Sequence, residues 1–320
     1  MKKDYLSLLK QCLLLTTLLF GLTACSHISS EPEPGLLKTR YGHAAVQDGK
    51  RIFILSGANT TGLLSDVEVY DPVSGKTEHW KEKLIPRQYF SAVWDGKESI
   101  YILGGISISA QGRLAPRLPI VQSRVEILNT RTGEVSYAPD LPAPTSNNTA
   151  VFSKGRILVF GGSRFAIDRL VPVSTVAVYD VAAKQWFKGA DMPEAKDSQA
   201  VVKDDWVYLV GGYNQRRGLN SFARYSPDLN QWQVLPAMPV KISAHSMTVR
   251  QNQLLVFGDY DETDSTYSYD FTKAQWQKLD LGYKHSRHSA AVTFHDDVYV
   301  FGGNAGDNGP LLNAIQKFSF

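Results

Sequence analysis

The sequence predicts an all-β fold made of six similar units, each with four short strands. Three observations lead to this prediction. An apolar run ending in two small residues recurs, a strand of small residues precedes each run, and an alternating strand with an aromatic residue follows it. The six runs lie 44–57 residues apart, which is the spacing of a repeat protein. They occupy residues 52–57, 100–105, 157–162, 207–212, 254–259 and 298–303.

Within each unit, the strands are named A to D in chain order. Strand A is rich in small residues, for example Ala44-Ala45-Val46, as expected where strands crowd around an axis. Strand B is the apolar run, and its final glycines permit positive φ angles. Strand C alternates and ends at a turn former, as in Val67-Glu-Val-Tyr-Asp71. Strand D carries an aromatic residue that can fill the space between neighbouring sheets: Trp80, Tyr137, Trp186, Trp232 and Trp276.

This set of landmarks resembles the Kelch repeat, which combines a double glycine, a Tyr-Asp pair and a spaced tryptophan. Some copies depart from the pattern, with Ser56-Gly57, Gly258-Asp259 and Leu128-Asn129 in place of the usual pairs. The resemblance covers residues 36–320 and implies a six-bladed β-propeller. It also implies that the loops between strands B and C and the links between strands D and A share one face, which binds partners.

The sixth unit ends at Phe320 within strand C. Counting back from the first unit places the missing strand at residues 27–34. We therefore expect the amino-terminal segment to pair with the last sheet and to close the ring. Pro32 and Pro34 are compatible with a strand at the edge of a sheet.

Residues 1–24 have the layout of a signal peptide, with Lys2 and Lys3 before an apolar stretch. The 14 residues between Lys10 and Cys25 are too few to span a bilayer as a helix. The alternatives are an ordinary cleaved signal and a lipoprotein signal. Leu22-Thr-Ala-Cys25 resembles the bacterial lipobox, in which the cysteine is acylated after cleavage. That resemblance implies lipid anchoring at Cys25, a short tether over residues 25–35, and a bacterial envelope location. Ser26 favours the outer membrane, facing the periplasm.

The predicted ligand face is unevenly charged. Loops 105–123, 162–175 and 212–221 contain six arginines and one aspartate, whereas residues 258–265 contain four acidic residues. Arginine suits the recognition of carboxylates and phosphates. We expect an anionic ligand or a protein patch to bind there. The candidate residues are Arg40, Arg87, Arg113, Arg117, Arg164, Arg169, Arg216, Arg217, Lys241, His245, Arg287 and His288.

Function is less constrained than fold. The net charge of +3 gives no reason to expect nucleic-acid binding. The sequence has no glycine-rich phosphate loop, nucleophile elbow or H-E-x-x-H motif, so no catalytic residue, metal or cofactor is predicted. The first hypothesis is a lipid-anchored, monomeric binding module for an envelope protein or an acidic glycan.

The alternative follows from a resemblance to the bacterial N-acetylneuraminate epimerases, which are six-bladed Kelch proteins. It implies a sugar epimerase or mutarotase, with arginines holding the carboxylate and His245, His288 or Glu262 moving protons.

Overall fold

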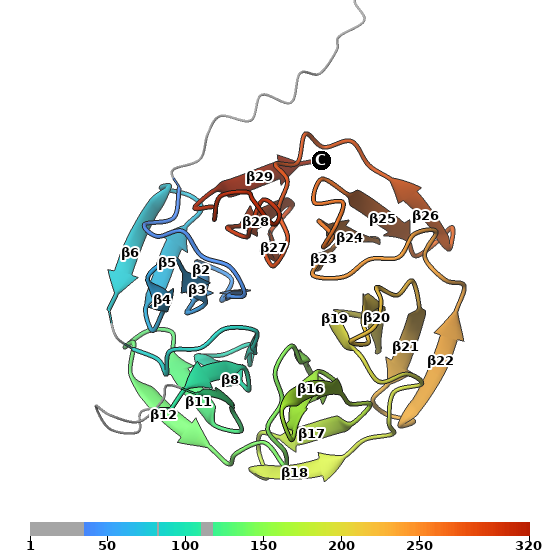
Figure 1. Ribbon diagram of the computed structural model, residues 1–320, viewed down its shortest axis with the longest axis horizontal. Helices are drawn as coiled ribbons and strands as arrows, with labels where there is room; N and C mark the ends of the chain where they lie inside the picture. The colour runs from blue at the N-terminus through green and yellow to red at the C-terminus, as the bar shows by residue number, and fades with distance from the viewer. Residues whose placement is uncertain (1–34, 82, 110–117) are drawn as a thin grey trace, which may run out of the picture. The chain divides into compact units, whose positions relative to one another are not determined.

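Six β-sheets surround a central axis in the computed structural model, which describes residues 35–81, 83–109 and 118–320. Figure 1 shows the strands of each sheet following one another outward from the axis. The six-bladed all-β propeller is therefore confirmed. The strands, from the axis outward, are β1 (Ala44–Gln47), β2 (Ile52–Leu55), β5 (Val67–Asp71) and β6 (Lys76–Trp80) in blade 1; β7 (Ser91–Trp94), β8 (Ser99–Leu103), β11 (Val125–Asn129) and β12 (Val135–Ala138) in blade 2; β13 (Thr149–Ser153), β14 (Arg156–Phe160), β17 (Val176–Asp180) and β18 (Gln185–Lys188) in blade 3; β19 (Asp197–Lys203), β20 (Trp206–Tyr213), β21 (Phe222–Ser226) and β22 (Gln231–Leu235) in blade 4; β23 (Ser246–Arg250), β24 (Gln253–Phe257), β25 (Thr266–Asp270) and β26 (Gln275–Lys278) in blade 5; and β27 (Ala290–Phe294), β28 (Asp297–Phe301) and β29 (Ile315–Ser319) in blade 6.

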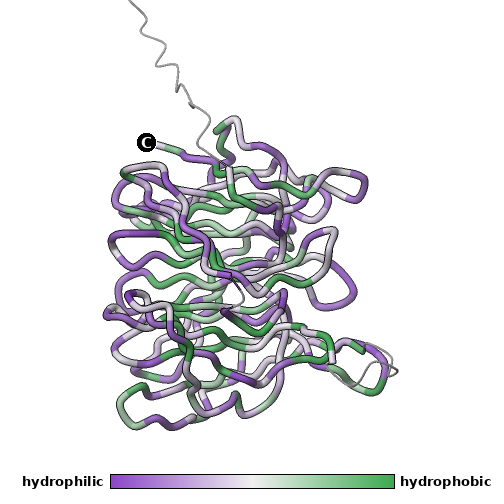
Figure 2. The backbone as a smooth tube through the Cα atoms, turned by 90° about the vertical axis from the view of Figure 1, so that its left-hand side faces the viewer, coloured by the Kyte–Doolittle hydropathy of each residue, from purple (hydrophilic) through white to green (hydrophobic). Residues whose placement is uncertain are grey.

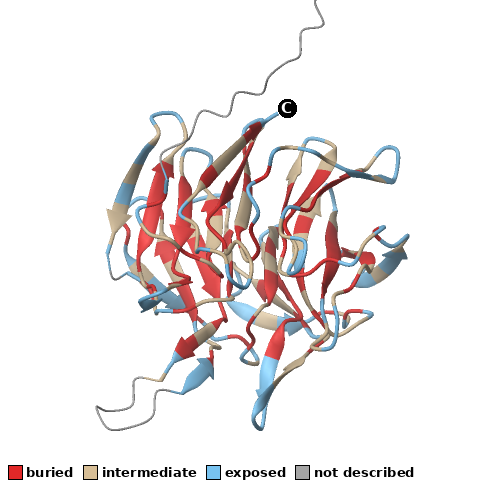
Figure 3. Ribbon diagram, turned by 45° about the horizontal axis from the view of Figure 1, so that its top comes forward, coloured by how far each residue is buried: buried red, intermediate tan, exposed pale blue. Residues whose placement is uncertain are grey.

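Neighbouring blades are joined by apolar packing. Each of the six hydrophobic clusters found in the described residues draws its members from two adjacent blades. Between blades 1 and 2, for example, Phe53 and Leu55 pack with Ile100 and Ile102. Figure 3 shows that the buried residues lie along the strands. A single sheet cannot bury both of its faces by itself. The hydrophobic core is therefore formed by packing between neighbouring blades around the closed ring.

The aromatic residues of the outer strands also join neighbours. Trp232 in blade 4 packs edge-on against Phe160 of blade 3, and its indole N–H donates to the Ala190 carbonyl at 2.8 Å. Trp276 in blade 5 likewise packs against Phe222 of blade 4. These contacts confirm that the spaced tryptophans fill the gaps between sheets.

The first and last blades meet at the segment around Leu36. The Leu36 N–H donates to the Asn313 carbonyl at 2.7 Å, and the Asn313 side-chain amide donates back to the Leu36 carbonyl at 3.2 Å. Arg40 continues the junction through backbone bonds to Leu312 and Gly303. The Leu36 side chain is buried in a cluster that contains Ile52 of blade 1 and Phe301 of blade 6.

The expectations for the signal peptide at 1–24, the lipidated Cys25 and the closing strand at 27–34 lie outside the described residues. In the part of the chain that the structure describes, no helix has the length and apolar character needed to cross a bilayer.

Three short hairpins extend the loops between strands B and C. They are β3 (Ala58–Asn59) with β4 (Gly62–Leu63), β9 (Ile106–Ile108) with β10 (Pro119–Val121), and β15 (Ser163–Ala166) with β16 (Arg169–Pro172). Figure 2 shows long loops reaching beyond the sheets, and its colouring places apolar segments on the strands and hydrophilic segments on many of the turns.

The glycine that ends strand B is required where it meets the next blade. Gly258 has a φ of +74°, and a Cβ atom there would overlap the Ser286 carbonyl oxygen. Gly49 has a similar φ of +83°, but a Cβ atom there would meet no atom within 4 Å.

We therefore expect Gly258→Ala to lower the free energy of unfolding by about 3 kcal/mol, because it combines backbone strain with a clash. Gly49→Ala is the matched control and should cost about 1 kcal/mol, from the strain alone. Urea denaturation of both variants measures the difference. Equal losses would show that the approach of Ser286 is unimportant.

Candidate functional site

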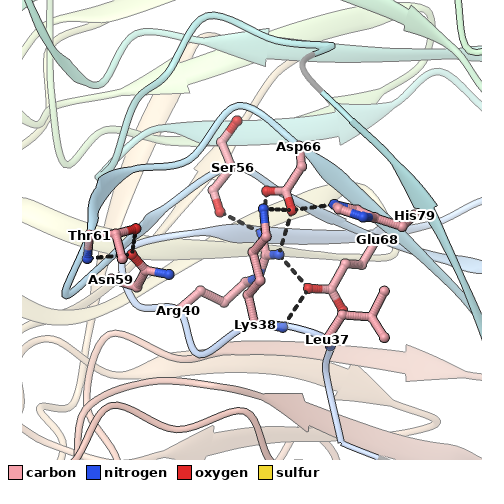
Figure 4. A network of polar contacts seen from close by, with 9 residues as sticks. All are labelled: Leu37, Lys38, Arg40, Ser56, Asn59, Thr61, Asp66, Glu68 and His79. Atoms are coloured by element: carbon pink, nitrogen blue, oxygen red, sulfur yellow. Dashed lines mark hydrogen bonds and ion pairs between the residues drawn. The ribbon is translucent and has the colours of Figure 1, made fainter.

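Two of the predicted ligand residues are buried structural cations. Arg40 is fully buried, and its guanidinium donates to the Ser56 carbonyl at 2.8 Å and pairs with Asp66 and Glu68 (Figure 4). Glu68 also accepts the backbone N–H groups of Leu37 and Lys38, at 2.7 and 3.1 Å. The same network includes His79, whose Nε2 lies 2.8 Å from Asp66.

Blade 2 repeats this arrangement. Arg87 is fully buried, donates to the Gly104 carbonyl at 2.8 Å and pairs with Glu126, which also accepts the Ile85 N–H at 3.0 Å. The expectation that Arg40 and Arg87 face a ligand is therefore wrong, because strand C supplies a carboxylate that draws each guanidinium into the blade. A sequence signal existed: Glu68 and Glu126 occupy the second position of strand C, where the other blades carry Ala177, Ala223, Tyr267 and Gln316.

Arg287 is also mostly buried. Its guanidinium lies over the Tyr260 ring at 3.8 Å, donates to the Tyr260 carbonyl at 2.7 Å and pairs with Asp307. The contacts with Tyr260 join the link before blade 6 to the loop that follows strand B in blade 5. Arg287 supports the wall of the mouth and is not one of the residues that line it.

A cavity of about 640 Å³ opens where the loops of all six blades converge. Its lining comes from the links before strand A and from the loops after strand B, mostly of blades 4 and 5. Five predicted residues meet there: Arg216, Arg217, Lys241, His245 and His288. The acidic residues Asp259 and Asp261 line the same cavity, so both signs of charge are present.

Two further predicted residues that the structure describes do not line this cavity. Arg164 and Arg169 are exposed on the hairpin β15–β16 and are absent from the lining. Arg113 and Arg117 lie outside the described residues.

Uncharged rings form part of the wall. His288 lies 5.1 Å from Tyr89 and 6.3 Å from Tyr260, measured between ring centroids. Burial and the charge of Arg287 lower the pKa of His288 to about 4, so its imidazole is neutral at pH 7. Burial also raises the pKa of Tyr89, which keeps the phenol neutral.

His245 is buried, and desolvation lowers its pKa to about 4, with the charge of Lys196 adding to the effect. It therefore contributes no positive charge at pH 7. Glu262, the third residue considered for proton transfer, is not among the cavity-lining residues.

A chain of backbone hydrogen bonds links the blades around the mouth. His288 donates to Ala244, Gly42 to His288, Tyr89 to Gly42, and Asn147 to Tyr89, at 2.7–3.0 Å. All five residues have positive φ. Blade 4 departs from this pattern, because its inner strand begins earlier, at Asp197, with a register shift between Asp197 and Gln199.

That irregularity presents Asp197 to the cavity. Its carboxylate accepts the Ser163 hydroxyl at 2.6 Å and the Gln215 amide at 3.1 Å. Burial raises the pKa of Asp197 to about 7, against the opposing effect of these two hydrogen bonds. Asp197 was not among the predicted site residues because the bulge cannot be seen in the repeat pattern. The adjacent charges of Lys196 and Asp197 at the end of this link were the available signal.

Comparison with known proteins supports the repeat assignment. The family model described as the KLHDC2/KLHL20/DRC7 Kelch-repeats domain matches residues 84–259, more than half of the chain. The chain belongs to the Kelch-repeat family. Among curated relatives of this Kelch protein, Kelch-like protein 23 of Homo sapiens is 26% identical over 214 residues, covering 66% of this chain and 35% of that protein.

Two further relatives give the same result. Kelch-like protein terF of Aspergillus terreus is 28% identical over 208 residues, covering 60% of this Kelch chain and 44% of that protein. Kelch-like protein 25 of Xenopus tropicalis is 24% identical over 257 residues, covering 78% and 42%. The chain thus spans less than half the length of these relatives.

Proposed function

We propose that this protein is a binding module that holds a protein partner at the mouth of the propeller. The supporting observation is the cavity, where exposed Arg216, Arg217 and Lys241 lie beside the rings of Tyr89 and Tyr260. Arginine and tyrosine are enriched among the residues that dominate protein–protein affinity. The relatives are named Kelch-like proteins, and their matches cover part of the propeller.

We further propose that the partner is an envelope protein and that the module is anchored in a bacterial outer membrane, facing the periplasm. This part rests on the sequence of residues 1–25. The basic start, the apolar stretch and Leu22-Thr-Ala-Cys25 resemble a lipoprotein signal. Several acyl chains on one residue anchor a protein more firmly than one chain, since each buried CH₂ contributes about 0.8 kcal/mol.

The exposed cations favour a partner surface that carries carboxylates. Complementary charge steers association and excludes wrong partners. An acidic glycan offers the same carboxylate chemistry, and it is the competing outcome of the experiment.

Capture from detergent-solubilised envelopes by the full-length protein tests this proposal. Arg216→Glu/Arg217→Glu should reduce the captured partner at least tenfold, because like charges then oppose docking. Lys188→Glu/Lys273→Glu is the matched control, since both lysines are exposed on outer parts of blades 3 and 5. It should leave capture unchanged. Equal capture by all three proteins would reject the mouth as the docking surface, and loss of capture after glycosidase treatment would identify a glycan.

A further inference from the structure

We propose that Asp197 makes the mouth cavity a receptor for an arginine side chain of the partner, whose guanidinium group pairs with the Asp197 carboxylate. This inference rests on the proposed function and names the group that the partner inserts. It also differs from the sequence expectation of an anionic ligand, because the cations lie on exposed loops whereas the half-buried carboxylate of Asp197 lies in the lining.

The first argument is that the buried carboxylates of this fold are paired with arginines. Asp66 and Glu68 pair with Arg40, and Glu126 pairs with Arg87. In the described part of the chain, Asp197 accepts only neutral donors, the Ser163 hydroxyl and the Gln215 amide. A carboxylate that is partly removed from water is stabilised more by a charged donor than by a neutral one, so Asp197 gains from an external cation.

The second argument is the hydrogen-bonding capacity that remains. Ser163 donates to Oδ1 of Asp197, and Gln215 donates to Oδ2. Each carboxylate oxygen can accept about two hydrogen bonds, which leaves capacity on both oxygens. A guanidinium presents two parallel N–H groups that match the two oxygens of one carboxylate. An ammonium group is a point donor and uses this arrangement less well.

The third argument is the aromatic lining. Tyr89, Tyr213 and Tyr260 border the cavity, and a guanidinium is a planar cation that stacks on such rings. The protein already shows this contact, since the Arg287 guanidinium lies 3.8 Å from the centroid of Tyr260.

The exposed cations then select the neighbours of the inserted arginine. Arg216, Arg217 and Lys241 repel an isolated positive charge but attract carboxylates that flank it. The best probe is therefore an arginine between two acidic residues. We choose the peptide acetyl-Glu-Arg-Glu-amide, together with its citrulline and lysine counterparts. Citrulline has nearly the shape of arginine without its charge.

The acid–base behaviour of Asp197 adds a distinctive signature. Its pKa of about 7 means that guanidinium binding must displace a proton at pH 6 but not at pH 9. Affinity should fall about tenfold for each pH unit below 7. The other titratable and charged groups that line the cavity are His43, Tyr89, Tyr213, Arg216, Arg217, Lys241, His245, Asp259, Tyr260, Asp261 and His288. The three histidines are neutral throughout this range, because their pKa values are lowered to about 3 or 4.

Isothermal titration calorimetry of the full-length protein in detergent tests the inference. At pH 8, the arginine peptide should bind at least tenfold more tightly than the citrulline peptide and more tightly than the lysine peptide. At pH 5.5, the preference for the arginine peptide should be about thirtyfold smaller than at pH 8. Titration at pH 6 in buffers of different ionisation enthalpy should show the release of about one proton.

Asp197→Asn should remove the preference for arginine at pH 8 and the proton release, while Asp205→Asn, which changes an exposed carboxylate outside the lining, should retain both. The pH dependence of peptide binding can be measured on the unaltered protein, so this part of the test does not depend on a variant. Equal arginine and citrulline affinities at pH 8, or no arginine binding at millimolar concentration, would overturn the inference. A lysine peptide as tight as arginine would overturn the guanidinium assignment. If Arg216→Glu/Arg217→Glu still abolishes partner capture in either case, the proposed function stands without this inference.

Discussion

Replacing Arg40 by methionine will lower the free energy of unfolding by about 3–5 kcal/mol, because the buried carboxylates of Asp66 and Glu68 lose their main countercharge. The side chains of Lys38 and His79 reach Asp66 only, so Glu68 keeps its backbone N–H donors but has no countercharge. The Ser56 carbonyl also loses its charged donor. Urea denaturation at pH 7, followed by tryptophan fluorescence, measures the loss.

Arg217→Met is the control for this change, since it removes an exposed arginine from the mouth and should alter stability by no more than about 0.5 kcal/mol. The double variant Arg40→Met/Glu68→Leu should recover part of the loss, because it removes one of the uncompensated carboxylates. A single variant as stable as the unaltered protein would show that the network contributes nothing to folding.

Asp197→Asn should have the opposite effect and raise the free energy of unfolding by about 2–4 kcal/mol at pH 8. The folded-state pKa of about 7 lies above the unfolded value of 3.8, so the folded protein binds a proton more readily between these limits. The stability of the unaltered protein therefore falls as pH rises from 4 to 7. Asparagine is neutral and escapes this cost. Its oxygen can still accept the Ser163 hydroxyl, and its amide N–H can donate to the Gln215 oxygen once the Gln215 amide is reversed.

The gain should shrink towards zero near pH 4, where Asp197 is protonated in both folded and unfolded chains. Guanidinium denaturation at pH 4.5 and pH 8 gives the comparison, with Asp261→Asn as a control that should show little gain at either pH. An equal gain at both values would mean that burial of charge does not explain the effect. A confirmed gain at pH 8 would show that the fold keeps a destabilising carboxylate at its mouth, as expected of a residue retained for binding.

Blade number and strand order were predictable because every blade packs against its neighbours in the same way. The run from Ile100 to Gly105 and its five counterparts must be buried on both faces and must end where the backbone approaches the next blade. Both requirements restrict the type of individual residues, and they recur once in every blade. The tryptophans follow the same logic, as Trp232 shows by packing against Phe160 of the preceding blade.

The chemistry at the mouth was less predictable, because it depends on pairs of residues far apart in the chain. Arg87 and Arg217 were both predicted to face a ligand, yet Glu126 draws the first into blade 2 while the second stays exposed. The environment of Asp197 arises from a bulge and from Ser163 in a different blade. Such partners are brought together only by the folded chain.

The junction of blades 1 and 6 has a mechanical consequence. Leu36 and Asn313 are joined by hydrogen bonds between two segments that lie 277 residues apart in the chain. Tension applied to the chain ahead of residue 35 would act first on these hydrogen bonds and on the packing of the buried Leu36 side chain. A fusion partner or affinity handle is therefore better attached at a surface turn, such as the one at Gly49, than immediately ahead of residue 35.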